Sequence, residues 1–250
     1  MKPPLAIQAV GQAPADITHY MRPGLLQLHT LPPLALYIHL PWCLQKCPYC
    51  DFNSHGLQHR APSGQNSANG QATAHLPEKD YLAALLADLE AALPLVWGRP
   101  VYSVFMGGGT PSLFSPDAIA ELIDAVRARL PLLPQCEITL EANPGTFERQ
   151  RFAAFAQAGV TRLSVGVQSF NDAMLHAIGR VHSAAQACAA LEEAARHFPA
   201  FNLDLMYALP GQTLPALQDD LAQALAFAPP HLSIYHLTIE PNTVFATRPP

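Results

Sequence analysis

Three of the chain's five cysteines lie within eight residues, in the stretch CLQKCPYC from Cys43 to Cys50. Thiolates at this spacing can reach one inorganic centre, and soft sulfur ligands favour zinc, copper(I) or an iron–sulfur cluster. A four-iron cluster usually takes one thiolate on each iron, so three thiolates would leave one iron open to a substrate or a second cofactor. Zinc would need a fourth ligand, which His39 or His55 could supply. The spacing alone leaves both centres open, as well as a group of free thiols.

The rest of the sequence predicts an α/β fold that could position this loop. Apolar, β-branched segments alternate with segments of helical spacing. The predicted strands are 34–41, 101–108, 137–144, 162–170, 201–211 and 231–241, and the predicted helices are 78–94, 115–131, 149–159, 171–197 and 214–229. In the second helix Ser115 is a candidate N-cap with Pro116 at the first helical position. Such alternation predicts a parallel sheet with right-handed crossovers, either an open doubly wound sheet or a partly closed barrel.

Unusual residues fall at the carboxyl ends of five predicted strands. They are Cys43 to Cys50, Gly107 to Pro111, Glu141 with Asn143, Gln168, and Glu240 with Asn242. Taken singly, each is also an ordinary residue of a turn or strand end. Barrel enzymes collect their functional groups from the carboxyl ends of several strands, so agreement across strands predicts one shared site.

Composition limits the setting and the partners. The formal charge is −5, with 14 Lys plus Arg and no basic run, which argues against nucleic acid and anionic membrane surfaces as partners. We find no apolar stretch long enough for a transmembrane helix and no export signal, so we expect a cytoplasmic protein. Thiols stay reduced in that compartment, so an odd number of cysteines there indicates metal or redox chemistry and not disulfides.

Two segments lack any apolar period. Residues 1–33 contain six prolines and are predicted to be a flexible N-terminal extension. Residues 56–77, which follow the cysteines, are rich in Gly, Ser, Asn, Gln and Ala and are predicted to be a flexible insert. The remaining 34–250 would then form one core domain.

The cysteine loop, with Tyr49 just before its last cysteine, resembles the signature of the radical S-adenosylmethionine (SAM) superfamily. In that family three cysteines hold a [4Fe-4S] cluster, and the amino and carboxylate groups of SAM bind the fourth iron. The resemblance implies that Cys43, Cys47 and Cys50 are the ligands and that the fold is a partial (β/α)6 TIM-like barrel. MGGGTPS, from Met106 to Ser112, resembles the family's glycine-rich turn, which receives the methionine amine.

Further stretches resemble the coproporphyrinogen III dehydrogenase branch of that superfamily, and most closely its HemW-type heme chaperones. They are LALYIHLPWCLQKCPYCDFNSH, EITLEANPG, RLSVGVQSFND, IGRVH, FNLDLMYALPGQT and LTIEPNT, within about 32–250. By position the resemblance implies that SAM is contacted by Tyr37, Tyr49, Gly108, Gly109, Thr110, Glu141, Gln168, Arg180 and Asp204. From the residues alone, Asp204 could instead be a paired acid of the core.

The resemblance implies a heme chaperone that binds heme, a [4Fe-4S] cluster and SAM and delivers heme to an acceptor protein. The alternative is an oxygen-independent coproporphyrinogen III oxidase of the same superfamily, for which an electron donor to the cluster is expected. In those dehydrogenases a cysteine stands two residues beyond the last cluster ligand, and here that residue is Phe52, which argues against the alternative. A third hypothesis is a zinc-stabilised protein. Relatives continue beyond the position of Pro250, so we expect their C-terminal region to be absent here.

The sequence does not identify a heme ligand. Histidine, cysteine, methionine and tyrosine all serve as axial ligands, and the chain has 11 histidines, including His39, His55, His182 and His236. No heme-attachment motif is present. The two remaining cysteines, Cys136 and Cys188, are predicted to be buried packing residues.

Overall fold

The computed structural model describes residues 32–57, 76–96 and 98–250. The extension predicted for 1–33 and the insert predicted for 56–77 therefore lie largely outside the described residues. Of the predicted insert, Gly56 lies in a short strand, and Leu76 and Pro77 lead directly into the first helix.

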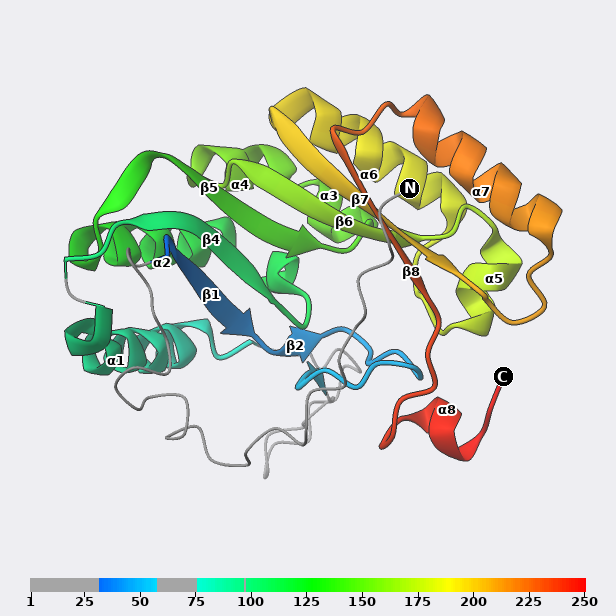
Figure 1. The fold of residues 1–250 in the computed structure, drawn as a ribbon, viewed down its shortest axis with the longest axis horizontal. Helices are drawn as coiled ribbons and strands as arrows, with labels where there is room; N and C mark the ends of the chain where they lie inside the picture. The colour runs from blue at the N-terminus through cyan, green and yellow to red at the C-terminus, as the bar shows by residue number, and fades with distance from the viewer. Residues whose placement is uncertain (1–31, 58–75, 97) are drawn as a thin grey trace, which may run out of the picture. The chain divides into compact units, whose positions relative to one another are not determined.

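Six parallel strands form the main sheet, and their order in the sheet is their order in the chain (Figure 1). A doubly wound sheet would reverse its order at a switch point, and this sheet does not. Within the described residues β1 and β8 each pair with only one strand of this sheet, so the sheet is open. The predicted partial barrel is thus confirmed. The strands are β1 (Leu34–Leu40), β4 (Val101–Gly108), β5 (Leu132–Ala142), β6 (Arg162–Gln168), β7 (Ala200–Tyr207) and β8 (His231–His236).

Helices fill the connections between the strands. They are α1 (Glu78–Val96), α2 (Pro116–Arg129), α3 (Thr146–Arg149), α4 (Phe152–Gln157), α5 (Asp172–Ala177), α6 (Ala184–His197), α7 (Leu214–Ala226) and α8 (Val244–Thr247), with a 3₁₀ turn η2 (Pro111–Leu113). Figure 1 shows α6 and α7 running alongside each other, and α6 contacts both β6 and β7. Right-handed βα crossovers place helices against the sheet in this way.

Side-chain caps fix the beginnings of several helices. The Ser115 hydroxyl accepts from the Ala118 amide at 3.1 Å, and Pro116 occupies the first helical position as predicted. Ser183 and Gln186 form a reciprocal capping box at α6. Such caps satisfy amide groups that have no partner within the helix, and each contributes about 1 kcal/mol.

The core lies between the sheet and its helices. Leu40, Met106, Leu140, Leu163 and Leu203 come from five successive strands and are fully buried. They pack with buried residues of α2 and α6 in one continuous cluster. This packing fixes the carboxyl ends of the strands relative to one another, and those ends carry the site.

Several boundaries differ from the predicted ones; for example, β5 begins at Leu132 and not at 137, and β7 ends at Tyr207 and not at 211. The segment 171–197 is two helices, because Asn171 and Ser183 each cap a new start and Gly179, with φ +69°, ends the first helix. Of the segment 149–159, only α4 (Phe152–Gln157) is a helix of its own, and Arg149 is the last residue of the preceding α3. The last strand ends at His236, earlier than predicted, and the Leu237 amide still donates to the Tyr207 carbonyl of β7 at 2.9 Å.

Two cysteines outside the loop pack as predicted but are less enclosed than expected. Cys136 and Cys188 are partly buried against the main core cluster rather than fully buried. Burial raises the pKa of both thiols, which favours the neutral form and an inert packing role. Across the part of the chain that the structure describes, no helix combines the length and apolar character needed to cross a membrane.

Candidate cluster and cofactor site

Cys47 and Cys50 are the first and last residues of a tight turn. The Cys50 amide donates to the Cys47 carbonyl at 3.1 Å, across Pro48 and Tyr49. Proline at the second position of such a turn has its φ already set, which favours this conformation. The sequence CPYC therefore brings the backbones of the last two cysteines of the motif close together through a local turn.

The first cysteine is held by a separate set of backbone bonds. β2 (Trp42–Cys43) pairs with β3 (His55–Gly56), and the Leu57 amide donates to the Cys43 carbonyl at 2.7 Å. The Thr110 amide of the glycine-rich turn donates to the Trp42 carbonyl at 2.7 Å. Cys43 is thus fixed beside the turn that follows β4.

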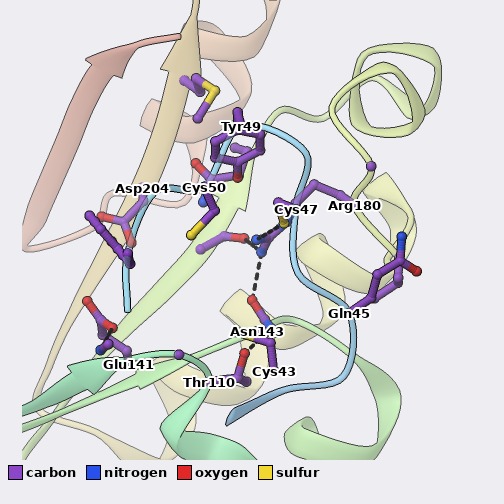
Figure 2. Close-up of a pocket in the computed structure, with 18 of the residues that line it drawn as sticks. Cys43, Gln45, Cys47, Tyr49, Cys50, Thr110, Glu141, Asn143, Arg180 and Asp204 are labelled. Atoms are coloured by element: carbon purple, nitrogen blue, oxygen red, sulfur yellow. Dashed lines mark hydrogen bonds between the residues drawn. The ribbon is translucent and has the colours of Figure 1, made fainter. Parts of the chain in front are cut away.

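A cavity of about 560 Å³ opens beside the cysteine loop, at the carboxyl ends of the strands. Figure 2 shows the cysteine loop together with Glu141 of β5 and Asp204 of β7, which line the same cavity. All three thiols line the cavity, together with the predicted residues Tyr49, Gly108, Gly109, Thr110, Glu141, Gln168, Arg180 and Asp204. Tyr37 is the one predicted residue outside the lining: its side chain is 56% exposed on β1, and its hydroxyl bonds to His39.

The three thiols fit a cluster better than a single zinc ion. Within the described residues, no three side chains of His, Cys, Asp or Glu are grouped closely enough for one metal ion. His39, a candidate fourth ligand, donates from Nε2 to the Asn53 carbonyl at 2.8 Å and accepts from the Tyr37 hydroxyl at 2.9 Å. Thiols that bind a four-iron cluster can lie further apart than the ligands of one zinc ion, because each thiolate binds a different iron.

The environment of Cys43 favours a thiol until a metal displaces the proton. Burial raises the pKa of the Cys43 thiol, and hydrogen bonds from Thr110 and Ser54 oppose that shift. Negative charge on Cys50 and Cys47 raises it further. The positive charge of iron bound to the three sulfurs would offset this repulsion, and each coordinating thiol would then be deprotonated.

The glycine-rich turn approaches the cysteine loop too closely for larger residues. A Cβ on Gly109 would lie 2.6 Å from the Pro41 carbonyl carbon and from the Trp42 carbonyl oxygen. Gly108 has φ +109°, and a Cβ there would overlap the ring of His39. Glycine is therefore required at both positions. The amides of Gly108, Gly109 and Thr110 already donate within the protein, so a ligand in the cavity would meet the carbonyl groups of the turn.

Glu141, at the end of β5, is an uncompensated carboxyl in the cavity wall. It accepts from the Gly108 amide at 3.2 Å. Burial raises the pKa of Glu141 to about 7, the Gly108 hydrogen bond opposes this, and the charge of Asp204 adds to it. A cationic group bound nearby would favour the carboxylate.

Arg180 connects the cysteine loop to the ends of two strands. Its guanidinium donates to Asn143 Oδ1 and to the Gly166 carbonyl, both at 2.7 Å, and to Cys47 Sγ at 3.8 Å. Asn143 in turn donates to the Thr110 hydroxyl at 3.0 Å. Figure 2 shows this chain of contacts from Cys47 through Arg180 and Asn143 to Thr110. A rigid, permanently charged fork suits such a bridge between a sulfur and two oxygens.

Asp204 and Gln168 complete the wall on the side of β6 and β7. Asp204 accepts from Asn202 at 2.6 Å and from Ser164 at 3.3 Å, and burial raises its pKa. Gln168 has φ +69° and accepts from the Tyr235 hydroxyl at 2.8 Å. An uncommon backbone conformation at a strand end often marks a functional site. Asp204 is thus both hydrogen-bonded, as a core acid would be, and exposed to the cavity.

The structure adds lining residues that the sequence did not single out for binding. Asn143 was expected at a strand end but without a role, whereas here it bridges Arg180 and Thr110. Ser164 and Tyr235 also line the cavity, and both lie inside strands that read as ordinary core segments. Alternation along each strand could have placed them on the inner face, but only the strand pairing shows that this face opens to a cavity.

A six-stranded parallel partial barrel with a three-cysteine loop over the carboxyl ends of its strands defines a cofactor-binding α/β protein. The family model of the Radical SAM superfamily matches residues 37–224. The chain belongs to that superfamily, whose members carry a [4Fe-4S] cluster and SAM. The cysteine group, the tight glycine turn and the carboxylates described above fit both groups.

Within the superfamily, the chain is similar to proteins of known name. The chain is 50% identical over 225 residues to "Heme chaperone HemW" of Haemophilus influenzae, which covers 88% of this chain and 55% of that protein. It is 51% identical over 221 residues to the protein of the same name from Escherichia coli, covering 88% of this chain and 54% of that protein. The chain thus spans about half the length of these relatives.

Among solved structures, the Escherichia coli coproporphyrinogen III oxidase HemN, described as a radical SAM enzyme, superposes with a TM-score of 0.72. The sequences are 28% identical, and the match covers 86% of this chain and 46% of that one. The fold is therefore that of the superfamily.

Proposed function

We propose that this chain is the cluster- and SAM-binding part of a heme chaperone that delivers heme to an acceptor protein. The observation that carries the proposal is the identity of about half of all aligned residues to proteins named heme chaperone HemW. The geometry of the cysteine loop and its cavity supports the cluster and SAM as its resident groups. We place the protein in the cytoplasm, with an electron donor that reduces the cluster.

In this proposal the three cysteines, Cys43, Cys47 and Cys50, hold the cluster, and the cavity beside them holds SAM. The backbone of Gly108 to Thr110 would receive the amine of SAM. Glu141 and Asp204 would accept hydrogen bonds from its amine or ribose, and Arg180 and Gln168 would orient the remaining polar groups. Tyr49 would contact SAM from the loop and Tyr37 from the rim of the cavity. The bound cluster supplies an iron that can ligate SAM and an electron.

The alternative, oxidation of a porphyrinogen, is supported by the structural likeness to coproporphyrinogen III oxidase. Phe52 argues against it. Its side chain is 63% exposed and lines the same cavity, so an apolar ring stands where the dehydrogenases of this branch carry a further cysteine. A phenyl ring cannot ligate iron or transfer a proton.

The surroundings of four histidines reduce the choice of residues that could ligate heme. His182 is buried, its Nε2 donates to the Val167 carbonyl at 3.0 Å, and burial lowers its pKa to about 4. His39 is engaged at both ring nitrogens. His55 and His236 are exposed, and of these two His236 lines the cavity. Of these four histidines, His236 is therefore the one that we propose as a heme ligand.

The test is a heme titration of the reconstituted protein, followed by absorption, beside assays for 5′-deoxyadenosine and for porphyrin product. The proposal predicts saturable heme binding without turnover of coproporphyrinogen. Turnover of coproporphyrinogen would establish the alternative. A Cys47→Ala variant serves as the control, because it removes the cluster and leaves the apolar lining of the cavity in place.

A further inference from the structure

A second, smaller hydrophobic cluster lies apart from the main core and directly beneath the cysteine loop. Its buried members are Ile178, Met206, Leu209 and Phe245, and Tyr49 packs against them. The members come from the end of α5, from β7 and from α8, so the cluster joins segments far apart in the sequence. Tyr49 is the residue between Pro48 and the last cysteine of the loop.

Phe245 of α8 contacts the turn between the second and third cysteines in two ways. Its backbone amide donates to the Pro48 carbonyl at 3.0 Å, and its ring centroid lies 6.5 Å from that of Tyr49. Only 6% of Phe245 is exposed, although α8 is a helix of a single turn. Its start is fixed by Thr243, whose hydroxyl accepts from the Ala246 amide at 3.2 Å and donates to the Glu240 carbonyl at 2.7 Å.

Gly179 supports the same turn from the other side. A Cβ on Gly179 would lie 2.6 Å from Pro48 Cδ, and its φ of +69° favours glycine in any case. The next residue, Arg180, reaches Cys47 Sγ. Pro48 is thus held between Gly179 and the backbone amide of Phe245.

The geometry points to α8 as a clamp that positions the cysteine turn, with Phe245 as its positioning residue. Phe245 fixes the backbone of Pro48 and the ring of Tyr49, and through them the separation of the Cys47 and Cys50 thiols. Without the clamp, the turn keeps its internal bond from Cys50 to Cys47 but loses the contacts that fix its place over the cavity.

This role does not depend on heme or on the proposed chaperone function. It concerns how the thiols are arranged before any cluster binds, so it can be tested on the protein without metal. A segment that makes few packed contacts opens locally at a low cost in free energy, and its groups are then exposed without unfolding of the whole chain. Local opening of the loop would raise the exposure of Cys47 and Cys50 and leave that of Cys136 and Cys188, which are partly buried elsewhere, unchanged.

The experiment is pulsed alkylation of the metal-free chain, with the modification of each cysteine measured by peptide mass spectrometry. Phe245→Ala is expected to raise the alkylation rates of Cys47 and Cys50 by about tenfold relative to the rate of Cys188 in the same sample. Phe245→Leu, which keeps an apolar side chain, should restore most of the protection. Cys188 lies on α6, partly buried against the main core cluster, and serves as the reference thiol because opening of the loop does not change its exposure.

The matched control is Phe198→Ala, which removes a buried ring that packs edge-on against Phe152 in the main core. It should lower the free energy of unfolding and leave the ratio of Cys47 to Cys188 alkylation unchanged. A raised ratio in Phe198→Ala, or an unchanged ratio in Phe245→Ala, would overturn the clamp. If Phe245→Ala does not fold, Thr243→Ala decides the matter, because it removes the hydroxyl that fixes the start of α8 and leaves Gly179 and Arg180 in place: a raised ratio supports the clamp and an unchanged ratio rejects it.

Discussion

Replacing Glu141 by glutamine should change how the stability of the metal-free protein depends on pH. Burial, together with the charge of Asp204, raises the pKa of Glu141 from its ordinary value of 4.5 to about 7. Below the lower value the carboxyl is protonated in both the folded and the unfolded chain, so it costs no stability. As the pH rises toward the higher value, the unfolded chain ionises while the folded chain stays protonated, and the free energy of unfolding falls.

The size of this loss follows from the pKa difference. At 1.36 kcal/mol for each pKa unit, ionisation of Glu141 should cost about 3 kcal/mol, all of it lost by the time the pH has passed the folded pKa. Glutamine stays neutral and keeps an oxygen that can accept from the Gly108 amide. Between about pH 5 and about pH 8, the stability of Glu141→Gln should therefore fall less than that of the unmodified chain, by up to about 3 kcal/mol.

Urea unfolding of both proteins at several pH values, followed by circular dichroism, measures this difference. Glu121→Gln, which changes an exposed carboxyl on α2, is the control and should follow the unmodified chain. Parallel curves for the unmodified chain and Glu141→Gln would refute the reasoning, because they would show that Glu141 ionises equally well in the folded and unfolded states.

Three further predictions concern the loop, a buried acid and the glycine turn. Cys47→Ala should abolish the cluster and leave the circular dichroism spectrum nearly unchanged; a full iron content in this variant would show that the ligand assignment is wrong. Asp220→Ala should lower the free energy of unfolding by about 3 kcal/mol, because it strands two buried donors, the Ser169 hydroxyl at 2.8 Å and the Phe170 amide at 2.7 Å. Urea unfolding measures this, and a loss below about 0.5 kcal/mol would contradict it. Gly109→Ala should lower the free energy of unfolding by about 2 kcal/mol and weaken SAM binding by calorimetry, since its Cβ would meet Pro41 and Trp42; unchanged affinity would separate the turn from the cofactor site.

Much of the fold follows from local sequence. The strand and helix alternation predicts the parallel sheet, and Ser115 with Pro116 predicts the start of α2 to the residue. The division of 171–197 into α5 and α6 was missed, because its alanine-rich helical composition outweighed the capping signals of Asn171 and Ser183. The choice between an open doubly wound sheet and a partial barrel needed the strand order, which depends on contacts distant in sequence.

The candidate site was predictable where residues act through their own motif. The cysteine loop and the glycine turn could be recognised from the sequence, because each consists of residues that are neighbours along the chain. Asn143 and Tyr235 could not be given roles in this way, because each acts on a residue from another strand or loop, Arg180 and Gln168 respectively. Phe245 has no motif at all, and only its packing against Tyr49 shows its connection to the loop.

The most direct test of the account is anaerobic reconstitution of the chain with iron and sulfide, followed by metal analysis and by electron paramagnetic resonance of the reduced protein with and without SAM. We predict about four irons per chain and a spectrum that changes when SAM is added. A colourless protein that retains tightly bound zinc, or a cluster whose spectrum is unaffected by SAM, would contradict the assignment of Cys43, Cys47 and Cys50 as three ligands beside an open iron.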